Sequence, residues 1–329
     1  KVRGAPVGAR VEARPGRKQV ARRLELREEA PDAVAPVCPA FGLCGGCQLQ
    51  EMPLTTQRVE KERLVTRLVL GEEPTPSVRV HTIRGADPGY AYRNKLELSF
   101  GSRQFLADAP DKSLPTARGT YLGFHPPGWY SKIVDLDGCP LGSDVMNRAV
   151  AALRERLPGP AWDSTNHTGQ WRHVVLRDCG TPEQPRLLVS LVTTSDVETD
   201  VLRDAASRVA EVPGVSGVCW IVNDGVAEVA TGELREVLHA EPELHFQIAG
   251  LDIHLPHDAF FQVNTPGAEI LVQTIAEAAG QGGSLIDLYC GSGLIGLALA
   301  ARFEQVIGIE LHPGAIECAK KNAELNGIR

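Results

Sequence analysis

The sequence contains no uninterrupted run of 18 apolar residues, so we predict no transmembrane helix and no membrane partner. Its first residues are basic and no apolar segment follows them, so we expect no secretory signal. Internal repeats and low-complexity tracts are also lacking. With 43% hydrophobic and 23% charged residues among 329, the composition is typical of a soluble globular protein with two or three domains.

An excess of positive charge is lacking as well. The chain has 34 Lys and Arg residues against 41 Asp and Glu residues, a net charge of −7, which argues against broad non-specific affinity for nucleic acid. Residues 1–29 differ, since they hold nine Lys or Arg residues against four Glu residues. Such a segment can contact RNA phosphates, but a solvated basic arm explains it equally well.

Eight cysteines without a secretory signal indicate a reducing compartment, so we expect a cytoplasmic protein whose closely spaced cysteines bind metal. Cys38, Cys44 and Cys47 stand together in the run CPAFGLCGGC, where the two glycines let backbone approach a ligand closely. Cys139 in DGCPLG is the best candidate for a fourth ligand, because a Cys-Pro pair also ends the ligand run of bacterial iron–sulfur proteins. Four thiolates suit zinc equally, and spacing leaves both metals open.

The predicted elements change in character along the chain. Alternating residues in 1–30 predict short strands of a small β-barrel, and a helix is expected over residues 54–69, ended by Gly71. Residues 80–250 resemble β-hairpins, interrupted by helices that start at Ser143 and span about 200–209. The segment after Thr265 predicts helices at 266–279, 294–302 and 313–326 and strands at 285–289 and 306–310. A strand–helix–strand unit of this spacing belongs to a parallel, doubly wound sheet.

The first of these strands runs into a glycine turn, IDLYCGSGLIG. Its glycines, Gly291, Gly293 and Gly296, form G-x-G-x-x-G, and Glu310 follows at the end of the next strand, where it can accept hydrogen bonds from ribose hydroxyls. A dinucleotide and S-adenosylmethionine are both possible ligands. The carboxylate of Asp287 before the turn favours S-adenosylmethionine.

Cys290 lies within the same turn and has two interpretations. It could be a nucleophile or a small residue behind the cofactor, and the lack of a suitable base after it favours the second.

Taken together, the motifs resemble one family. CPAFGLCGGCQLQ, YRNKLELSF, DGCPL, FFQVN, DLYCGSG and IGIEL occur in the order found in the RNA uracil-5-methyltransferases, which are S-adenosylmethionine enzymes acting on transfer RNA or large-subunit ribosomal RNA. The resemblance covers nearly the whole chain. The cysteine loop together with FFQVN is specific, whereas the glycine turn alone is not.

The resemblance implies two cofactor sites. It implies a [4Fe–4S] cluster, and it implies contacts with S-adenosylmethionine from the FFQVN segment, the glycine turn and the acidic residue after it. The residues concerned are Cys38, Cys44, Cys47 and Cys139 for the cluster and Gln262, Tyr289, Gly291, Gly293 and Glu310 for the methyl donor. Leu294 departs from the family, since many relatives carry Asn there, so that contact must come from backbone or be absent.

The expected fold class is α/β and multi-domain. The expected divisions are a partial TRAM-like, OB-like RNA-binding β-barrel (1–35), an iron–sulfur loop with a helix (36–75), a central α+β RNA-recognition domain (76–255) and the N-terminal part of a Rossmann-like S-adenosylmethionine-dependent methyltransferase domain (256–329). Six side chains of the later segments, Arg93, Lys95, Arg172, His173, His257 and Asp258, either face the RNA and the site or are ordinary surface charges.

The implied reaction is methylation of carbon 5 of a uridine in RNA, in the first place 23S ribosomal RNA, with transfer RNA as the alternative. Carbon 5 is a poor nucleophile, so a cysteine thiolate adds to carbon 6, carbon 5 attacks the donor methyl, and a base then removes the carbon 5 proton. In the family the nucleophilic cysteine, the base and a DPPR motif follow the second strand of the cofactor sheet, so we expect them after Arg329.

We therefore expect a monomeric but truncated enzyme. Because the reaction moves no electrons, the cluster is expected to be a scaffold. A non-catalytic RNA-binding iron–sulfur protein is the alternative function, and a methyltransferase acting on protein or small molecules is a third.

Overall fold

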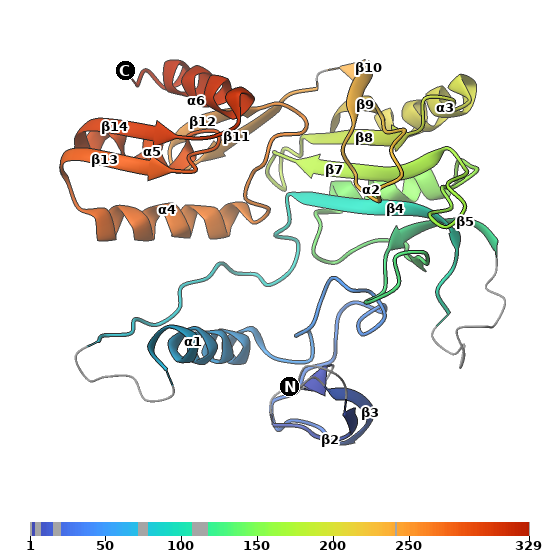
Figure 1. Ribbon diagram of the computed structural model, residues 1–329, viewed down its shortest axis with the longest axis horizontal. Coiled ribbons are helices and arrows are strands. Elements are labelled where there is room, and N and C mark those ends of the chain that lie inside the picture. Colours follow the sequence, from blue (N-terminus) through green and yellow to red (C-terminus); the bar gives the residue numbers. More distant parts are fainter. Residues whose placement is uncertain are drawn as a thin grey trace. The chain divides into compact units, whose positions relative to one another are not determined.

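The computed structural model describes residues 2–3, 8–15, 21–71, 78–106, 118–240 and 242–328 (Figure 1). The chain divides into two units, one made of residues 1–85 and 126–128 and the other of residues 86–125 and 129–329. The four-part division expected from the sequence stays a prediction. Within the described residues, no helix combines the length and the apolar character needed to cross a membrane.

The first unit contains a small sheet and one long helix. Its elements are β1 (Val2–Arg3), β2 (Arg10–Pro15), β3 (Ala21–Glu28) and α1 (Leu54–Leu70). The strand order is β1-β3-β2, with β2 antiparallel and β1 parallel to β3. Helix α1 ends where predicted, because Gly71 adopts a φ of 89° and its N–H bonds to the Arg67 carbonyl. The predicted strands are confirmed, whereas the barrel stays a prediction and its expected turn at Gly16 lies outside the described residues.

A seven-stranded mixed sheet forms the centre of the second unit (Figure 1). Its strands are β4 (Lys95–Arg103), β5 (Arg118–Phe124), β6 (Val134–Asp135), β7 (Trp171–Asp178), β8 (Leu187–Thr193), β9 (Val215–Val222) and β10 (Glu233–Ala240). The order is β10-β9-β8-β7-β4-β5-β6, and only β8 and β9 are parallel to each other. The hairpin pattern read from the sequence therefore produces one continuous sheet.

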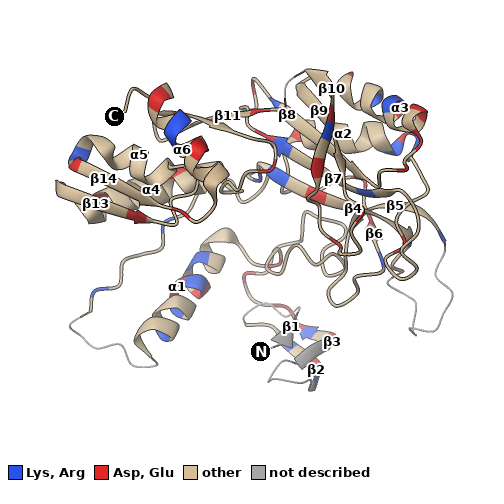
Figure 2. Ribbon diagram, turned by 45° about the horizontal axis from the view of Figure 1, so that its top comes forward, with Lys and Arg blue, Asp and Glu red and all other residues tan. Residues whose placement is uncertain are grey.

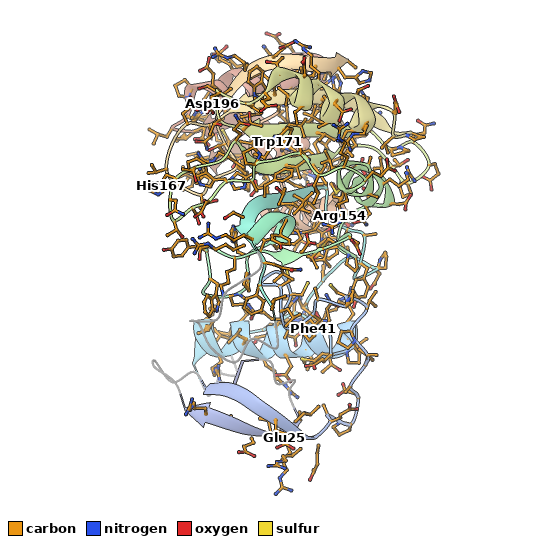
Figure 3. The ribbon with its side chains drawn as sticks, turned by 90° about the vertical axis from the view of Figure 1, so that its right-hand side faces the viewer. Glu25, Phe41, Arg154, His167, Trp171 and Asp196 are labelled. Carbon is orange, nitrogen blue, oxygen red and sulfur yellow. The ribbon has the colours of Figure 1, made fainter. Side chains whose placement is uncertain are left out.

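Two hydrophobic cores lie on the opposite faces of this sheet. Strands β7 and β8 are buried along their whole length, and alternate residues enter different cores: Val174 and Val189 the first, Val175 and Leu188 the second. Trp171, which Figure 3 labels, is fully buried in the first core. Strand β8, LLVSLVT, is accordingly almost wholly apolar, whereas the polar residues of β7 are buried with it because neither face of the central strands meets water.

Helices α2 (Asp144–Arg154) and α3 (Thr199–Ala210) cover the face that carries the first core. The predicted apolar stripe of α2 is confirmed, since Met146, Ala149, Val150 and Leu153 are buried. Helix α3 forms the crossover between the parallel strands β8 and β9, as parallel pairing requires. Charged side chains of both signs occur along α1 and α3 (Figure 2).

The C-terminal elements pack against the second core on the other face. They are β11 (Leu244–Ile248), β12 (Leu251–Leu255), α4 (Thr265–Ala279), β13 (Gly282–Leu288), α5 (Leu294–Leu299), the 3-10 turn Ala300–Arg302, β14 (Phe303–Ile309) and α6 (Pro313–Leu325). Strands β13 and β14 pair in parallel, with Asp287 opposite Gly308 and Leu288 opposite Ile309. The predicted parallel strand–helix–strand unit is confirmed, except that its helix tightens into a 3-10 turn after Leu299.

Candidate functional site

The turn between β13 and α5 is built from residues with left-handed backbone. Tyr289, Gly291 and Gly293 have φ values of 62°, 54° and 88°. The turn is fixed on one side by Tyr289 N–H donating to the Ile309 carbonyl at 2.8 Å, and it closes where Gly293 N–H donates to the Cys290 carbonyl at 2.9 Å. Glycine adopts this conformation without the steric cost that other residues meet, so the turn requires glycines at 291 and 293.

The carboxylate of Glu310, which follows the second strand, holds this turn. Glu310 Oε2 accepts a hydrogen bond from Gly291 N–H at 3.1 Å, and Glu310 Oε1 accepts from Leu311 N–H and His312 N–H at 2.7 and 2.9 Å. These backbone donors, foremost His312 N–H, lower the pKa of Glu310, so the carboxylate stays ionised. A carboxylate fixed at the carboxyl end of the second strand is placed as a ribose-binding acid requires.

Asp287 anchors the start of α5. Its Oδ2 accepts from Gly296 N–H at 2.9 Å, and burial raises the pKa of Asp287 although this hydrogen bond acts in the other direction. A Cβ at position 296 would lie 3.2 Å from Asp287 Oδ2 and 3.3 Å from Val306 Cγ1. The third glycine therefore allows the helix to approach both strands closely.

Side chains around the turn differ sharply in exposure. Tyr289 is 88% exposed and Leu311 93% exposed, although both are large hydrophobic side chains, so each offers uncovered apolar surface beside the turn. Leu294 is buried in the second core. The position where many relatives carry Asn thus contributes to packing, and its side chain is not available for a polar contact with a ligand.

The FFQVN segment is held in place by the YRNK segment, which lies far away in the sequence. Asn94 Nδ2 donates to the Gln262 carbonyl at 2.7 Å and to Thr265 Oγ1 at 2.9 Å, and Asn94 N–H donates to the Val263 carbonyl at 2.9 Å. Phe261 is buried in the same core as Leu294, whereas the Gln262 side chain is exposed. Asn94 therefore fixes the backbone on which the exposed Gln262 side chain stands.

The next residue with a structural role in this segment is Asn264. Its Oδ1 accepts from Gly267 N–H at 2.8 Å and caps α4. The motif thus combines a core residue, an exposed amide and a helix cap in five consecutive positions.

The Cys290 side chain is half-buried, and its thiol lies against β14. A Cβ at Gly308 would come within 2.9 Å of the Cys290 Sγ, so this thiol packs on the backbone of β14. Burial raises the pKa of Cys290, and the carboxylates of Asp287 and Glu310 raise it further. A thiol with a raised pKa is a poor nucleophile at neutral pH, in agreement with the interpretation of Cys290 as a turn residue.

The cysteine loop between β3 and α1 is shaped by backbone hydrogen bonds. Gly42 has a φ of 85°, and the N–H of Cys44 donates to the Ala40 carbonyl at 3.0 Å. Gly46 N–H donates to the Cys44 Sγ at 3.4 Å, and Cys38 N–H donates to the Gln50 side chain at 3.1 Å. An N–H directed at a sulfur is the arrangement that stabilises a thiolate ligand, so the loop fits a metal centre.

Cys139 belongs to the second unit, and its peptide is fixed by a reciprocal pair of hydrogen bonds. Its N–H donates to Asn147 Oδ1 at 2.8 Å, and Asn147 Nδ2 donates to its carbonyl at 3.3 Å. The thiol is half-buried against the first core. Helix α2 thereby holds the DGCPLG turn in one conformation.

Two of the residues considered for RNA contact are interior residues, so that interpretation is wrong for them. Arg172 is fully buried; it donates to the carbonyls of residues 223, 225 and 227 and lies 4.3 Å from the centre of the Trp162 ring. His173 is 4% exposed and pairs with Ser99. Strand β7 is buried on both faces. The order of polar and apolar residues in the sequence does not show this, because polar residues in a strand usually indicate a face exposed to solvent. For Arg93, Lys95, His257 and Asp258 a role towards RNA or the site stays a prediction.

Two features were missed by sequence reasoning. Asn94 bonds to partners 168 and 171 residues away, so no local pattern indicates its role. His245 and His254 lie at equal distances in sequence from the Ala249-Gly250 turn. Their pairing could have been predicted from the sequence by taking Ala249 and Gly250 as the centre of a hairpin.

A family model described as tRNA (Uracil-5-)-methyltransferase matches residues 240–329, the segment from the hairpin β11–β12 to the end of the chain. Two relatives described as uncharacterized RNA methyltransferases are similar over essentially the whole chain. The one from Chlorobaculum tepidum is 34% identical over 99% of this chain and 68% of its own length; the one from Caldanaerobacter subterraneus is 32% identical over 100% and 72%.

A solved structure shares the fold. The Pyrococcus abyssi tRNA (uracil-54, C5)-methyltransferase in complex with S-adenosyl-L-homocysteine aligns with a TM-score of 0.73 at 23% identity, over 100% of this chain and 72% of that chain. The mixed α/β architecture is therefore one that a methyltransferase of known structure also has. With the family match and relatives that span the chain, we conclude that this methyltransferase belongs to the RNA (uracil-5-)-methyltransferase family.

Proposed function

We propose that the protein uses S-adenosylmethionine to methylate carbon 5 of a specific uridine in RNA. The observation that carries the proposal is the glycine turn with its fixed acid: Glu310 is ionised, bonded to Gly291 N–H and placed at the carboxyl end of β14. A carboxylate oxygen has more than one acceptor position, so Glu310 can keep these bonds and still accept from ribose hydroxyls.

The other contacts with the methyl donor are assigned from the chemical character of the exposed groups around the turn. Gly291 has no atom within 4 Å of where a Cβ would stand, so the backbone there is open to a ligand. We assign the exposed ring of Tyr289 and the exposed Leu311 to the apolar faces of the bound donor, and the exposed amide of Gln262 to its polar groups. Gly293, as the N-cap of α5, fixes the start of the helix that follows this proposed binding surface.

The chemical step needs a thiolate that adds to uracil carbon 6 and a base that later removes the carbon 5 proton. Cys290 does not suit the first role, because its thiol packs on β14 and its pKa is raised. Through the resemblance, we assign the nucleophile and the base to the part of the methyltransferase fold that follows the second strand of the cofactor sheet. The target uridine must leave its stack to reach such a site, so an RNA loop or a flipped base is the expected substrate.

Two RNAs are candidates. We propose 23S ribosomal RNA as the substrate, with residues 1–35 acting as a TRAM-like RNA-binding segment of a monomeric, cytoplasmic enzyme. Transfer RNA is the second candidate, and it is favoured by a specific observation: both the family description and the Pyrococcus abyssi structure name transfer RNA.

We also propose a [4Fe–4S] cluster held by Cys38, Cys44, Cys47 and Cys139. The support is the thiolate-stabilising N–H of Gly46 in the loop, together with the fixed Cys-Pro turn in the second unit. When bound, the cluster would supply rigidity rather than electrons, because methyl transfer to uracil is not a redox reaction. Iron and sulfide analysis of protein purified without oxygen tests this, and Cys38→Ser is expected to lose both; zinc bound in their place would contradict it.

The function is tested by mass spectrometry of transfer and ribosomal RNA from a strain that lacks the gene. Loss of one 5-methyluridine from 23S RNA supports the ribosomal substrate, loss from transfer RNA supports the second candidate, and loss from neither refutes the proposal. Complementation with Glu310→Gln is expected to restore little methylation. Glu317→Gln is the matched control, because this exposed acid on α6 pairs with Lys320 and not with the turn.

A further inference from the structure

A group of metal-binding side chains lies outside the glycine turn, on the hairpin β11–β12. His245 Nε2 and His254 Nδ1 lie 3.9 and 4.0 Å from the same oxygen, Glu243 Oε2. The two imidazole rings have centroids 3.6 Å apart and are tilted by 55°. In the part of the chain that the structure describes, these three residues form the group whose ligand atoms all lie within 4.8 Å of one another.

The hairpin turn sets this arrangement. Ala249 and Gly250 have φ values of 52° and 76°, positive at both central positions, as in a type I′ turn. Such a two-residue turn pairs Ile248 with Leu251 and, three steps along, His245 with His254. Directly opposite residues have Cβ atoms about 5 Å apart on one face of the hairpin, a separation that lets two imidazoles bind one ion.

Contacts with α6 keep the second histidine in place. The N–H of His254 donates to Asn322 Oδ1 at 2.9 Å, and the Cys318 thiol donates to the His254 carbonyl at 3.1 Å. Asn322 is fully buried, so this support is rigid. A ligand whose backbone is held on a packed element loses little freedom on binding a metal.

The donor set has a clear chemical preference. Two imidazole nitrogens and one carboxylate form the set used by zinc sites that keep a fourth position for water. Ligand atoms of a tetrahedral zinc ion lie about 3.3 Å apart. The two distances from Glu243 Oε2, 3.9 and 4.0 Å, must therefore shorten by roughly 0.6–0.7 Å, and the remaining separation, which is within 4.8 Å, by up to about 1.5 Å. The Glu243 side chain is 60% exposed and can make this movement, while the histidine side chains, 26% and 38% exposed, remain accessible to an incoming ion.

We propose that Glu243, His245 and His254 bind one zinc-class divalent ion. The ion would join β11 to β12 and to the segment preceding β11, and so stabilise the hairpin that packs against α6. This site shares no residue with the cysteine loop or with the glycine turn, and it uses nitrogen and oxygen ligands where the cysteine loop offers sulfur.

The test is a zinc titration of the intact protein, with the metal environment read by zinc X-ray absorption. Wild-type protein is expected to bind an ion with a nitrogen and oxygen shell at about 2.0–2.1 Å, distinct from zinc on thiolates at about 2.3 Å. His254→Asn and Glu243→Gln are each expected to weaken this binding at least about tenfold and to remove that shell. Because Glu243 is largely exposed, Glu243→Gln is expected to fold as the wild type does, so a loss of zinc binding in this variant cannot be attributed to misfolding.

His239→Asn is the matched control, since His239 is an exposed histidine that faces Val218 across β10 and β9. It is expected to bind zinc as the wild type does. The proposal is overturned if Glu243→Gln and His254→Asn retain wild-type affinity and stoichiometry, or if the zinc taken up by the wild type has sulfur ligands alone.

Discussion

Two glycines of the same turn should respond differently to the same substitution. At both Gly291 and Gly293 an alanine must adopt a left-handed backbone, with φ near 54° and 88°, at a cost of about 1–2 kcal/mol. About 0.4–1 kcal/mol of this is offset because alanine restricts the unfolded chain. The surroundings then separate the two positions.

A Cβ at position 293 would stand 3.1 Å from Leu297 Cδ1 and 3.2 Å from Ala319 Cβ, whereas one at position 291 meets nothing within 4 Å. Crowding adds about 1–3 kcal/mol at position 293 only. Gly293→Ala should therefore lower the free energy of unfolding by about 2–4 kcal/mol, and Gly291→Ala by about 1 kcal/mol.

The affinity for the cofactor should show the opposite order, with the larger loss in Gly291→Ala. The open space at Gly291 is where the donor is proposed to lie, so Gly291→Ala is expected to weaken binding of S-adenosylhomocysteine about tenfold or more, equal to about 1.4 kcal/mol. Gly293→Ala should bind nearly normally at temperatures where it is folded. Urea denaturation and calorimetric titration of the intact protein measure both quantities. Equal stability of the two variants would refute the packing argument, and undiminished binding by Gly291→Ala would refute the placement of the donor.

Three further predictions concern the second unit. Asp135 accepts hydrogen bonds from both Nη atoms of Arg154 at 2.8 and 2.9 Å (Arg154 is labelled in Figure 3). Asp135→Asn should therefore lower the free energy of unfolding, measured by urea denaturation, by about 2 kcal/mol. Asp137→Asn, at a side chain that is 96% exposed, should lower it by less than about 0.5 kcal/mol, and equal losses for the two variants would contradict this. Burial lowers the pKa of His173 from 6.5 to about 3, so below pH 6.5 the unfolded chain takes up a proton that the folded chain refuses. Stability should consequently fall by about 1.4 kcal/mol per pH unit from this group as the pH drops from 6.5 towards 3, and His173→Asn should remove that part of the slope; an unchanged slope would show that His173 is protonated in the fold. Ala249→Gly should raise the thermal midpoint, with a gain of about 0.5–1 kcal/mol, because glycine relieves the positive φ of 52°; a lower midpoint would argue against the type I′ turn.

The sequence predicted the C-terminal elements closely because their signals are local. A glycine turn between an apolar strand and a helix has few backbone solutions, so the positions of Gly291 and Gly293 in the turn and of Glu310 after the next strand could be predicted from spacing alone. The same holds for the stripe of α2 and the Gly71 stop of α1, since both depend on residues within one or two turns of a helix.

Predictions from the sequence were wrong where a residue's role depends on burial of both faces of its strand or on contact with a residue far away in the sequence. Arg172 and His173 appear as polar positions in a strand, yet β7 has a core on each side, and burial turns Arg172 into the support of the loop at residues 223–227. Leu294 seemed to be a missing polar contact and is instead part of the second core.

By itself, the sequence determined the parallel unit, the glycine turn with its acid and the cysteine loop, because each is specified by residues close together in the chain. Only the tertiary structure decided that Asn94 holds the FFQVN backbone, that Cys290 lies behind the turn with a raised pKa, and that Glu243, His245 and His254 converge. These features arise from contacts between residues brought together by sheet packing and hairpin register, and the free energy of such contacts depends on burial and distance that no linear pattern contains.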